Sequence, residues 1–354
     1  MPPSTYNRRK WSGALVRKIR VQSAVIGILI GLGCIAILLR QVDLKQSWNA
    51  LGRLNGPYLL VPFAIFFVNL PMRAWRWQRI FPASQRPSLT ACLTALGIGN
   101  MANFLLPGRA GDLARCVLVG RSGSLDEGGR ALATLAVEKV LDGLALVGMV
   151  LFAAWAVHPP HWVLELLRVA VLIFGGALLL LVILRYQTRI LIPYVRAVFR
   201  AVRLSFLEER FDGLLTSFSD GLSAVGSATQ MLILLATTAV IWTTEAVVVW
   251  GLAAALELTV SLKSAVVASA VLGLGLMIPG APGGVGTYEL FGTEAFQLAG
   301  IAPSSALAIT VVIHAWVFVA NITAGMCLLA IKGLSLAQLR SRLAVEESGI
   351  QPSS

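Results

Sequence analysis

The chain has 354 residues, of which 57% are hydrophobic and 13% are charged, and its formal net charge at pH 7 is +12. So few charged residues could not cover that much apolar surface in water, which excludes a soluble globular protein and indicates an integral membrane protein. In a membrane protein, excess Lys and Arg reflects cytoplasmic loops and anionic lipid head groups, so the charge does not indicate nucleic-acid binding.

The first apolar run covers residues 21–39 and is long enough to span a bilayer, with no small-residue cleavage pattern after it. Residues 1–20 carry basic and no acidic side chains, so this end is predicted to be cytoplasmic. By the same rule, segments 73–87 and 185–228 are predicted to be cytoplasmic. Trp75 and Trp77, in the first of them, are interpreted as part of an interfacial aromatic belt.

The topology deduced from the charges predicts that two apolar stretches, residues 88–120 and 264–300, are hairpins. The chain is predicted to be inside both before and after residues 88–120, so this stretch must enter the membrane and return. Residues 264–300 must do the same from the opposite side. We therefore predict an all-α polytopic membrane protein with a single transmembrane domain over residues 21–335. It has about six transmembrane helices and two oppositely oriented re-entrant helical hairpins, arranged like inverted repeats. The alternative is that both stretches are plain crossings.

Two segments are predicted to lie outside the bilayer core. Apolar residues recur with a helical period over about 204–224, which predicts an amphipathic helix on the cytoplasmic membrane surface. Residues 336–354 are polar and are predicted to form a cytoplasmic tail, so both termini are expected on the cytoplasmic side.

Each predicted hairpin is interrupted by Pro and Gly beside fixed charge. Pro107 and Gly108 mark the first break, and Pro282 and Gly283 mark the second. Broken helices with charge at membrane depth are how many transporters form a substrate site near the bilayer midplane. Arginine suits a lipid phosphate there because its planar fork matches phosphate oxygens. The predicted head-group site consists of Asn103, Arg109, Asp112, Arg115, Glu138, Asp142, Gly283, Gly284 and Glu289.

A charged side chain at the centre of a membrane helix costs about 2.5–3.5 kcal/mol on insertion scales, so each one calls for an explanation. Glu245 and Glu289 are candidates for proton coupling. The alternative for the arginines and carboxylates is a structural one, in which Arg109, Arg115, Asp112 and Glu138 only neutralise one another.

Three motifs occur in order along the chain: Asn103, Pro107, Gly111, Asp112 and Arg115; then Glu138, Lys139 and Asp142; then Pro282 to Glu289. Together they resemble the flippase-like family typified by the transmembrane, lipid-flipping domain of lysylphosphatidylglycerol synthases. The family usually has Glu where this chain has Asp112, and often Arg where it has Lys139, and both differences keep the charge. No aminoacyl-transferase domain follows, so the resemblance implies lipid handling without the synthase activity.

The sequence therefore predicts a bacterial inner-membrane lipid translocase that is not an enzyme. No nucleotide-binding motif occurs, so transport would be passive or proton-coupled, and no cofactor or metal site is expected. The expected partners are membrane lipids, whether anionic, aminoacylated or polyprenyl-linked, and a homodimer is left open. One alternative is an intramembrane enzyme of lipid or isoprenoid-linked metabolism. Another is a non-catalytic membrane scaffold for a lipid-modifying partner.

Overall fold

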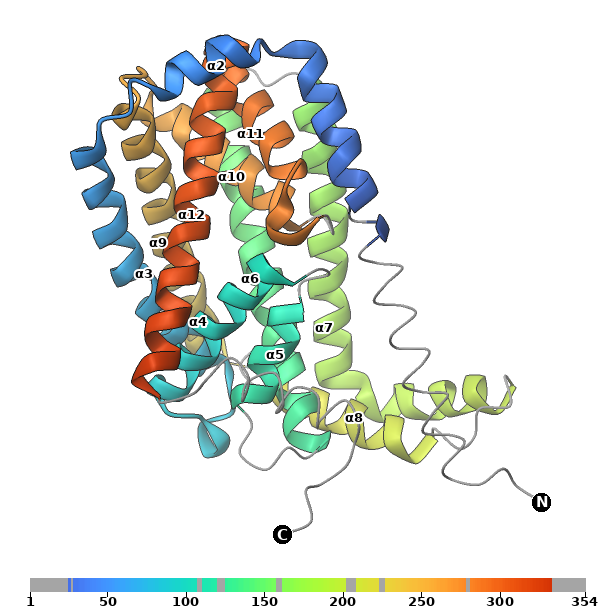
Figure 1. Cartoon of the computed structure of the whole chain (residues 1–354). Helices are drawn as coiled ribbons and strands as arrows, with labels where there is room; N and C mark the ends of the chain where they lie inside the picture. Colours follow the sequence, from blue (N-terminus) through green and yellow to red (C-terminus); the bar gives the residue numbers. More distant parts are fainter. Residues whose placement is uncertain are drawn as a thin grey trace.

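The structure is a computed structural model of the chain, and it describes residues 25–26, 28–106, 110–119, 125–156, 161–201, 208–222, 227–277 and 281–332. Within these ranges the regular elements are helices and none is a strand. The long helices run side by side along one axis and form an elongated bundle (Figure 1).

In chain order, the helices are Ile28–Gln41, α2 (Leu44–Leu51), α3 (Leu60–Ile80), α4 (Leu89–Leu105), α5 (Ala110–Val119), α6 (Leu125–Ala156), α7 (His161–Ala201), α8 (Glu208–Gly221), α9 (Ala228–Ala255), α10 (Leu262–Met277), α11 (Thr287–Leu298) and α12 (Pro303–Ile331). The short 3-10 helices η1 (Gly56–Leu59), η2 (Ala83–Gln85) and η6 (Pro282–Gly284) stand between them.

Several of these helices are suited to a bilayer. Among the described residues, four stretches are long and apolar enough to cross one: Gly56–Ile80, Val163–Gln187, Ala228–Ala255 and Pro303–Ile331. Three apolar helices are shorter: Ile28–Gln41, α4 and α10. Helix α6 has 32 residues, which is ample length, but carries Glu138, Lys139 and Asp142 in its middle. The prediction of an all-α, multi-pass membrane protein is confirmed at this level.

Short sequence signals set the helix ends. The hydroxyl of Ser88 accepts a hydrogen bond from the N–H of Ala91 (3.2 Å) and so caps α4. Pro303 begins α12, where a missing N–H leaves no intrahelical bond unmade. Helix α4 ends at Leu105, just before Pro107 in the sequence, because proline disfavours a helical residue in front of it.

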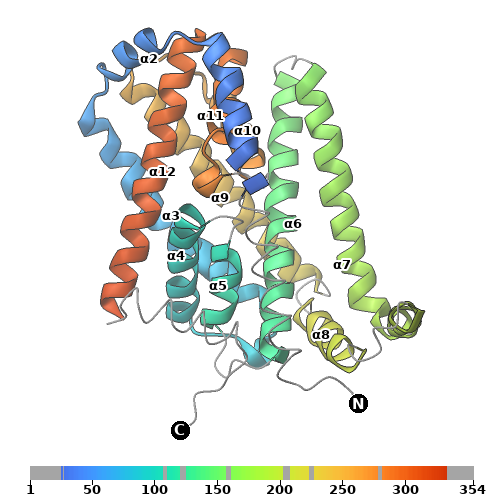
Figure 2. The ribbon, with the colours of Figure 1, turned by 45° about the vertical axis from the view of Figure 1, so that its right-hand side comes forward.

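Two pairs of short helices occupy opposite halves of the bundle. Helix α4 packs against α5 in the lower half, and α10 packs against α11 in the upper half (Figure 1, Figure 2). The 3-10 helix η6, which follows α10, contacts α4. The end of α4 and η6 therefore lie close to each other near the middle of the bundle.

The basic segment at residues 73–87 is divided between the end of α3 and the turn that follows it. Helix α3 continues to Ile80, so Arg73 and Arg76 lie on a helix, and the Arg76 side chain is buried. Trp77 is fully buried and donates a hydrogen bond to the Thr134 hydroxyl (3.1 Å), so its interpretation as an interfacial residue is wrong. Counting charges along the sequence gives no information on partners that are remote in the chain, so it does not reveal that these arginines are paired inside the protein.

Helix α7 has 41 residues and bends at its lower end, where α8 packs against α6 and α7 (Figure 2). Helix α8 lies within the range 204–224, for which the sequence predicts a helix. Its end is fixed by the Ser219 hydroxyl, which donates to the Leu184 carbonyl (3.2 Å), and by the buried side chain of Leu222. This end of the bundle is thus tied together by packing between α6, α7 and α8.

Close approach of α4 and α5 depends on two glycines. A methyl group added at Gly111 would overlap the carbonyl oxygen of Gly99. We expect Gly111→Ala to lower the free energy of unfolding by about 1–3 kcal/mol, because the two backbones must separate. Gly176→Ala on α7 is the matched control, since a Cβ there meets nothing within 4 Å. Denaturant titration in detergent would measure both, and equal stability of the two variants would contradict the expected overlap.

Candidate functional site

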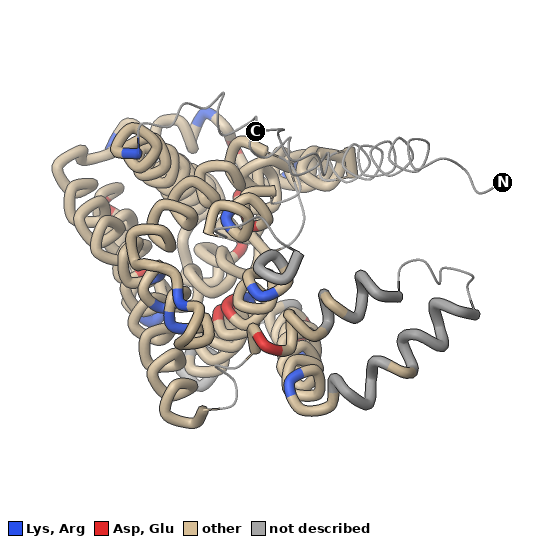
Figure 3. The backbone as a smooth tube through the Cα atoms, turned by 90° about the horizontal axis from the view of Figure 1, so that it is seen from below, with Lys and Arg blue, Asp and Glu red and all other residues tan. Residues whose placement is uncertain are grey.

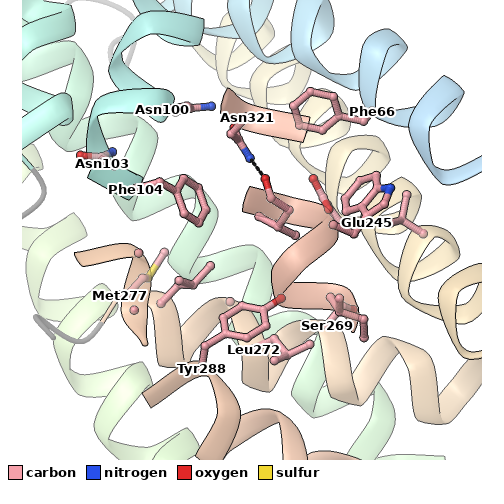
Figure 4. A pocket seen from close by; sticks show the side chains of 18 of the residues that line it. Phe66, Asn100, Asn103, Phe104, Glu245, Ser269, Leu272, Met277, Tyr288 and Asn321 are labelled. Carbon is pink, nitrogen blue, oxygen red and sulfur yellow. Dashed lines mark hydrogen bonds between the residues drawn. The ribbon is translucent and has the colours of Figure 1, made fainter. Parts of the chain in front are cut away.

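A cavity of about 250 Å³ lies in the middle of the bundle, where the end of α4 meets η6. Its wall combines aromatic rings, side-chain amides and charged groups (Figure 4). The aromatic residues are Phe66, Phe104, Trp242, Tyr288 and Trp316, and the amides are Asn69, Asn100, Asn103 and Asn321. The charged residues are Arg73, Lys139, Asp142 and Glu245. Mixed polar and apolar walls of this kind are typical of binding sites for small organic groups.

Arg73 and Glu245 form an ion pair on the cavity wall. The Arg73 Nη2 atom lies 2.8 Å from Glu245 Oε1, and the two side chains are 23% and 26% exposed. Arg73 Nε donates to Asn69 Oδ1 (2.9 Å), and its guanidinium lies over the Trp242 ring, 5.5 Å from the centroid. This pair joins α3 to α9 and remains accessible from the cavity.

Arg76 and Asp142 form a second ion pair, deeper in the protein. Arg76 Nη1 donates to Asp142 Oδ1 (2.7 Å) and to the Thr238 hydroxyl (2.9 Å). The same carboxylate oxygen accepts a hydrogen bond from the indole N–H of Trp242 (3.1 Å). Asp142 therefore connects α3, α6 and α9 while also lining the cavity.

The guanidinium of Arg115 is surrounded by two carboxylates and an aromatic ring. Its Nη1 and Nη2 atoms donate to both oxygens of Glu138 (3.1 and 2.9 Å), and its Nε atom lies 3.5 Å from Asp112 Oδ1. The guanidinium also lies over the Trp77 ring, 4.9 Å from the centroid. Such a bidentate pair compensates two buried charges and fixes α5 against α6.

Asp112 links the first break to α6. Its Oδ1 atom accepts a hydrogen bond from the amide of Asn103 (3.2 Å), while its own N–H donates to Asn103 Oδ1 (3.1 Å). Its Oδ2 atom lies 3.5 Å from the ammonium of Lys139. The end of α4, the start of α5 and the middle of α6 are therefore held by one reciprocal set of contacts beside the cavity.

Charges in this network are balanced. Its basic residues are Arg73, Arg76, Arg115 and Lys139, and its acidic residues are Asp112, Glu138, Asp142 and Glu245. Seen from below, several basic and acidic positions lie inside the outline of the bundle, and others lie at its rim (Figure 3). Balance of this kind makes buried charge tolerable, because each ion has an opposite charge at contact distance.

Glu289 and His314 form a separate pair at the second break. The Nδ1 atom of His314 lies 2.5 Å from Glu289 Oε1, and its Nε2 atom lies 2.9 Å from the carbonyl oxygen of Gly283. The other oxygen of Glu289 accepts the N–H of Gly286 (2.6 Å). The Tyr288 ring stacks on the imidazole, with centroids 4.4 Å apart.

The predicted site residues divide into two groups. Asn103, Asp142, Gly283 and Gly284, with the predicted proton-coupling residue Glu245, line the cavity. The ion pairs beside it hold Asp112, Arg115, Glu138 and Glu289. Arg109 lies outside the described residues. The structure thus brings the described residues into one region, with some on the cavity wall and others behind it.

Sequence reasoning missed Arg73 and Arg76 as members of this region. The sequence does contain a signal that they belong to a helix. The two residues are three apart, so they share one helix face, and tryptophans rather than turn residues stand beside them. Their partners Glu245 and Asp142 are 172 and 66 residues away, which no local pattern reveals.

The fold and the cavity define a multi-pass membrane protein with a polar, charge-balanced chamber between two broken helices. Residues 24–325 match the family described as the lysylphosphatidylglycerol synthase TM region, and the chain belongs to this family. The resemblance found in the motifs is confirmed.

The chain is also similar to a protein named "Glycosyltransferase AglD" from Haloferax volcanii. The two are 26% identical over 372 residues, which cover 96% of this chain and 59% of that protein. This chain therefore spans about three fifths of the length of the relative it matches. With the family match, this likeness supports a membrane protein connected with lipids.

Proposed function

We propose that this protein moves a lipid with a charged or polar head group across a bacterial inner membrane and makes no covalent change in it. The α4–α5 and α10–α11 pairs would be the two re-entrant hairpins, entering from opposite sides, and both termini would be cytoplasmic. The head group would pass through the cavity while the acyl or prenyl tails stay in the bilayer.

The observation that carries this proposal is the polar cavity at the meeting point of the two helix breaks. A head group that enters a bilayer loses its water, and the cost is large unless polar groups replace that water. Here Arg73 and Lys139 offer donors to a phosphate, while Asp142 and Glu245 can accept from hydroxyl or ammonium groups.

Amide side chains add neutral donors and acceptors to the site. Asn100, Asn103 and Asn321 lie along the cavity wall and can bond to many kinds of head group (Figure 4). At the second break, Gly283 and Gly284 bring backbone close to the cavity, at φ values of 68° and 81° that glycine adopts without strain. We include Arg109, from the predicted set, as a further head-group residue in this proposal.

The second candidate function is a catalytic role in lipid-linked sugar metabolism, which the similarity to the Haloferax volcanii protein named as a glycosyltransferase favours. It would require chemistry on the lipid inside the cavity. The proposed translocase and this enzyme differ in one measurable way, because only the enzyme releases a chemically altered lipid.

Reconstitution of the purified protein into liposomes would test the proposal. Trace amounts of labelled anionic, aminoacylated or polyprenyl-phosphate-linked sugar lipids would be added to the membrane, and their loss from the outer leaflet followed by chemical quenching. We expect protein-dependent movement of at least one class, with each lipid recovered unchanged by mass spectrometry. Movement of none of them would overturn the proposal, and recovery of an altered lipid would favour the enzyme.

A bulky side chain in the cavity should block this movement. Asn321 lines the cavity, and its amide donates a hydrogen bond to the Val317 carbonyl of its own helix (2.8 Å). We expect Asn321→Trp to slow lipid movement by about tenfold or more, because the indole occupies space that the head group needs. Asn321→Leu removes the amide at nearly constant volume and should keep most of the rate. Equal rates for the two variants would contradict passage through this cavity.

A further inference from the structure

The Glu289–His314 pair has a geometry that fixes its proton content. Nε2 of His314 faces the Gly283 carbonyl at 2.9 Å, and a carbonyl has no proton to donate, so Nε2 must be the donor. Oε2 of Glu289 is occupied as the acceptor of the Gly286 N–H (2.6 Å). The remaining contact, between Nδ1 and Oε1 at 2.5 Å, therefore also needs a proton between its two atoms.

A neutral imidazole beside an ionised carboxylate cannot satisfy this arrangement. Neutral histidine carries a single N–H, so it can serve either Glu289 or Gly283 but not both. The observed contacts require one more proton, held between His314 and Glu289. Both side chains are largely buried.

We infer that Glu289 and His314 form a proton-operated latch on the second helix break, an inference that rests on the proposed lipid movement. With the extra proton present, the imidazole ties the Gly283 carbonyl of η6 to α12. Once the proton leaves, the single N–H of His314 stays with the negative Glu289. Nε2 then presents a lone pair to the Gly283 carbonyl, and the break is released.

Release of this break matters because Gly283 and Gly284 form part of the cavity wall. The same break contacts the end of α4 through Phe104, whose ring lies 6.5 Å from the imidazole centroid. A closed latch thus holds the two helix breaks against each other. We expect its opening to widen the path between them and to speed lipid movement.

Other titratable groups surround the pair. On α11, Tyr288 stacks against the imidazole, and in the helix Ile28–Gln41 the thiol of Cys34 is near enough to interact with the Glu289 charge. On α9, Glu245 interacts with Tyr288 but is itself paired with Arg73. Helix α10 contributes no titratable residue beyond Lys263 at its start, and α4 faces the pair with Phe104.

Two substitutions should hold the latch in opposite states. In Glu289→Gln the amide can donate to Nδ1 while the Nε2–H group still donates to the Gly283 carbonyl. Both contacts therefore persist without a titratable proton. In His314→Phe the stack on Tyr288 is kept, but both contacts are lost. The first variant should behave like the wild type at low pH, and the second like the wild type at high pH.

Nitrogen-15 spectroscopy of ring-labelled histidine tests the proton site without any lipid assay. The chain has three histidines, and loss of a signal in His314→Phe identifies the one of interest. Across the pH range in which the protein stays folded, we expect its ring to pass from two protonated nitrogens to one as the pH is raised, and to stay singly protonated throughout in Glu289→Gln. A ring whose protonation is constant in the wild type, or is unaffected by Glu289→Gln, would overturn the latch.

Lipid movement in the same pH range tests the consequence. We expect the wild-type rate to rise by about tenfold with pH, the change expected when one buried hydrogen bond is lost. Glu289→Gln should stay slow and His314→Phe fast at every pH, while the exposed His161→Gln control keeps the wild-type profile. A pH dependence that survives in Glu289→Gln would overturn the inference.

The two proposals can fail separately. A wild-type protein that moves lipid at a pH-independent rate would refute the latch and leave the translocase standing. A protein that moves no lipid at any pH, but whose His314 titrates as expected, would refute the translocase and leave the proton site standing.

Discussion

Arg115→Met is expected to be the most destabilising single substitution in the charged network, lowering the free energy of unfolding by about 3–5 kcal/mol. Arg115 is 1% exposed and Glu138 is 7% exposed, so the substitution leaves a carboxylate buried without its bidentate partner. It also removes the guanidinium from the Trp77 face. Unfolding in mixed micelles, followed by tryptophan fluorescence, would measure the loss.

Removing both charges separates pairing from packing. We expect Arg115→Met with Glu138→Met to recover much of the lost stability, because no buried ion is then left uncompensated. Arg168→Met is a matched control on α7, where Arg168 and Glu165 are 2.6 Å apart but 70% and 61% exposed. An exposed pair of this kind contributes about 0–1 kcal/mol, so this variant should unfold like the wild type.

This set of variants tests the structural interpretation of Arg115, in which it only neutralises its acidic neighbours. If Arg115 serves to neutralise its neighbours, stability falls in the single variant and returns in the double one. If Arg115→Met is as stable as the wild type but moves no lipid, Arg115 binds substrate and the structural account of it is wrong.

The membrane class and the family could be predicted from the sequence because they depend on local features. Long apolar stretches, sparse charge and three motifs in order are all visible without knowledge of tertiary contacts. Helix ends could be anticipated on the same basis, as at Ser88, Pro107 and Pro303. Each of these signals acts over a few residues and needs no partner elsewhere in the chain.

Partners of the buried charges could not be predicted because they are remote in sequence. A count of charges treats Arg73 and Arg76 as loop residues, whereas each is paired with a carboxylate on another helix. The sequence places His314 on one face of the last helix, but nothing local indicates that both its ring nitrogens are occupied by groups of the second break. The partners of these side chains are determined by tertiary packing, which local sequence patterns do not reveal.

Arg73→Met is expected to affect lipid movement more than stability. The Arg73–Glu245 pair is about a quarter exposed, so its loss should cost less folding free energy than loss of the fully buried Arg115–Glu138 pair. Movement of an anionic lipid should fall by about tenfold or more, because a charge-assisted hydrogen bond to the phosphate is lost. The liposome assay and micelle unfolding, run on the same preparation, would compare the two effects.

A second variant distinguishes head-group binding from simple neutralisation of Glu245. If Arg73 only balances that carboxylate, Arg73→Met combined with Glu245→Met leaves a neutral wall and should restore lipid movement. If Arg73 binds the phosphate, the double variant stays slow, whereas Arg73→Lys, which keeps the charge but loses the planar fork, recovers part of the rate. We expect the second pattern, since Arg73 and Lys139 are the cavity-lining cations in the described part of the chain. Full recovery in the double variant would assign Arg73 to the structure, as we assign Arg115.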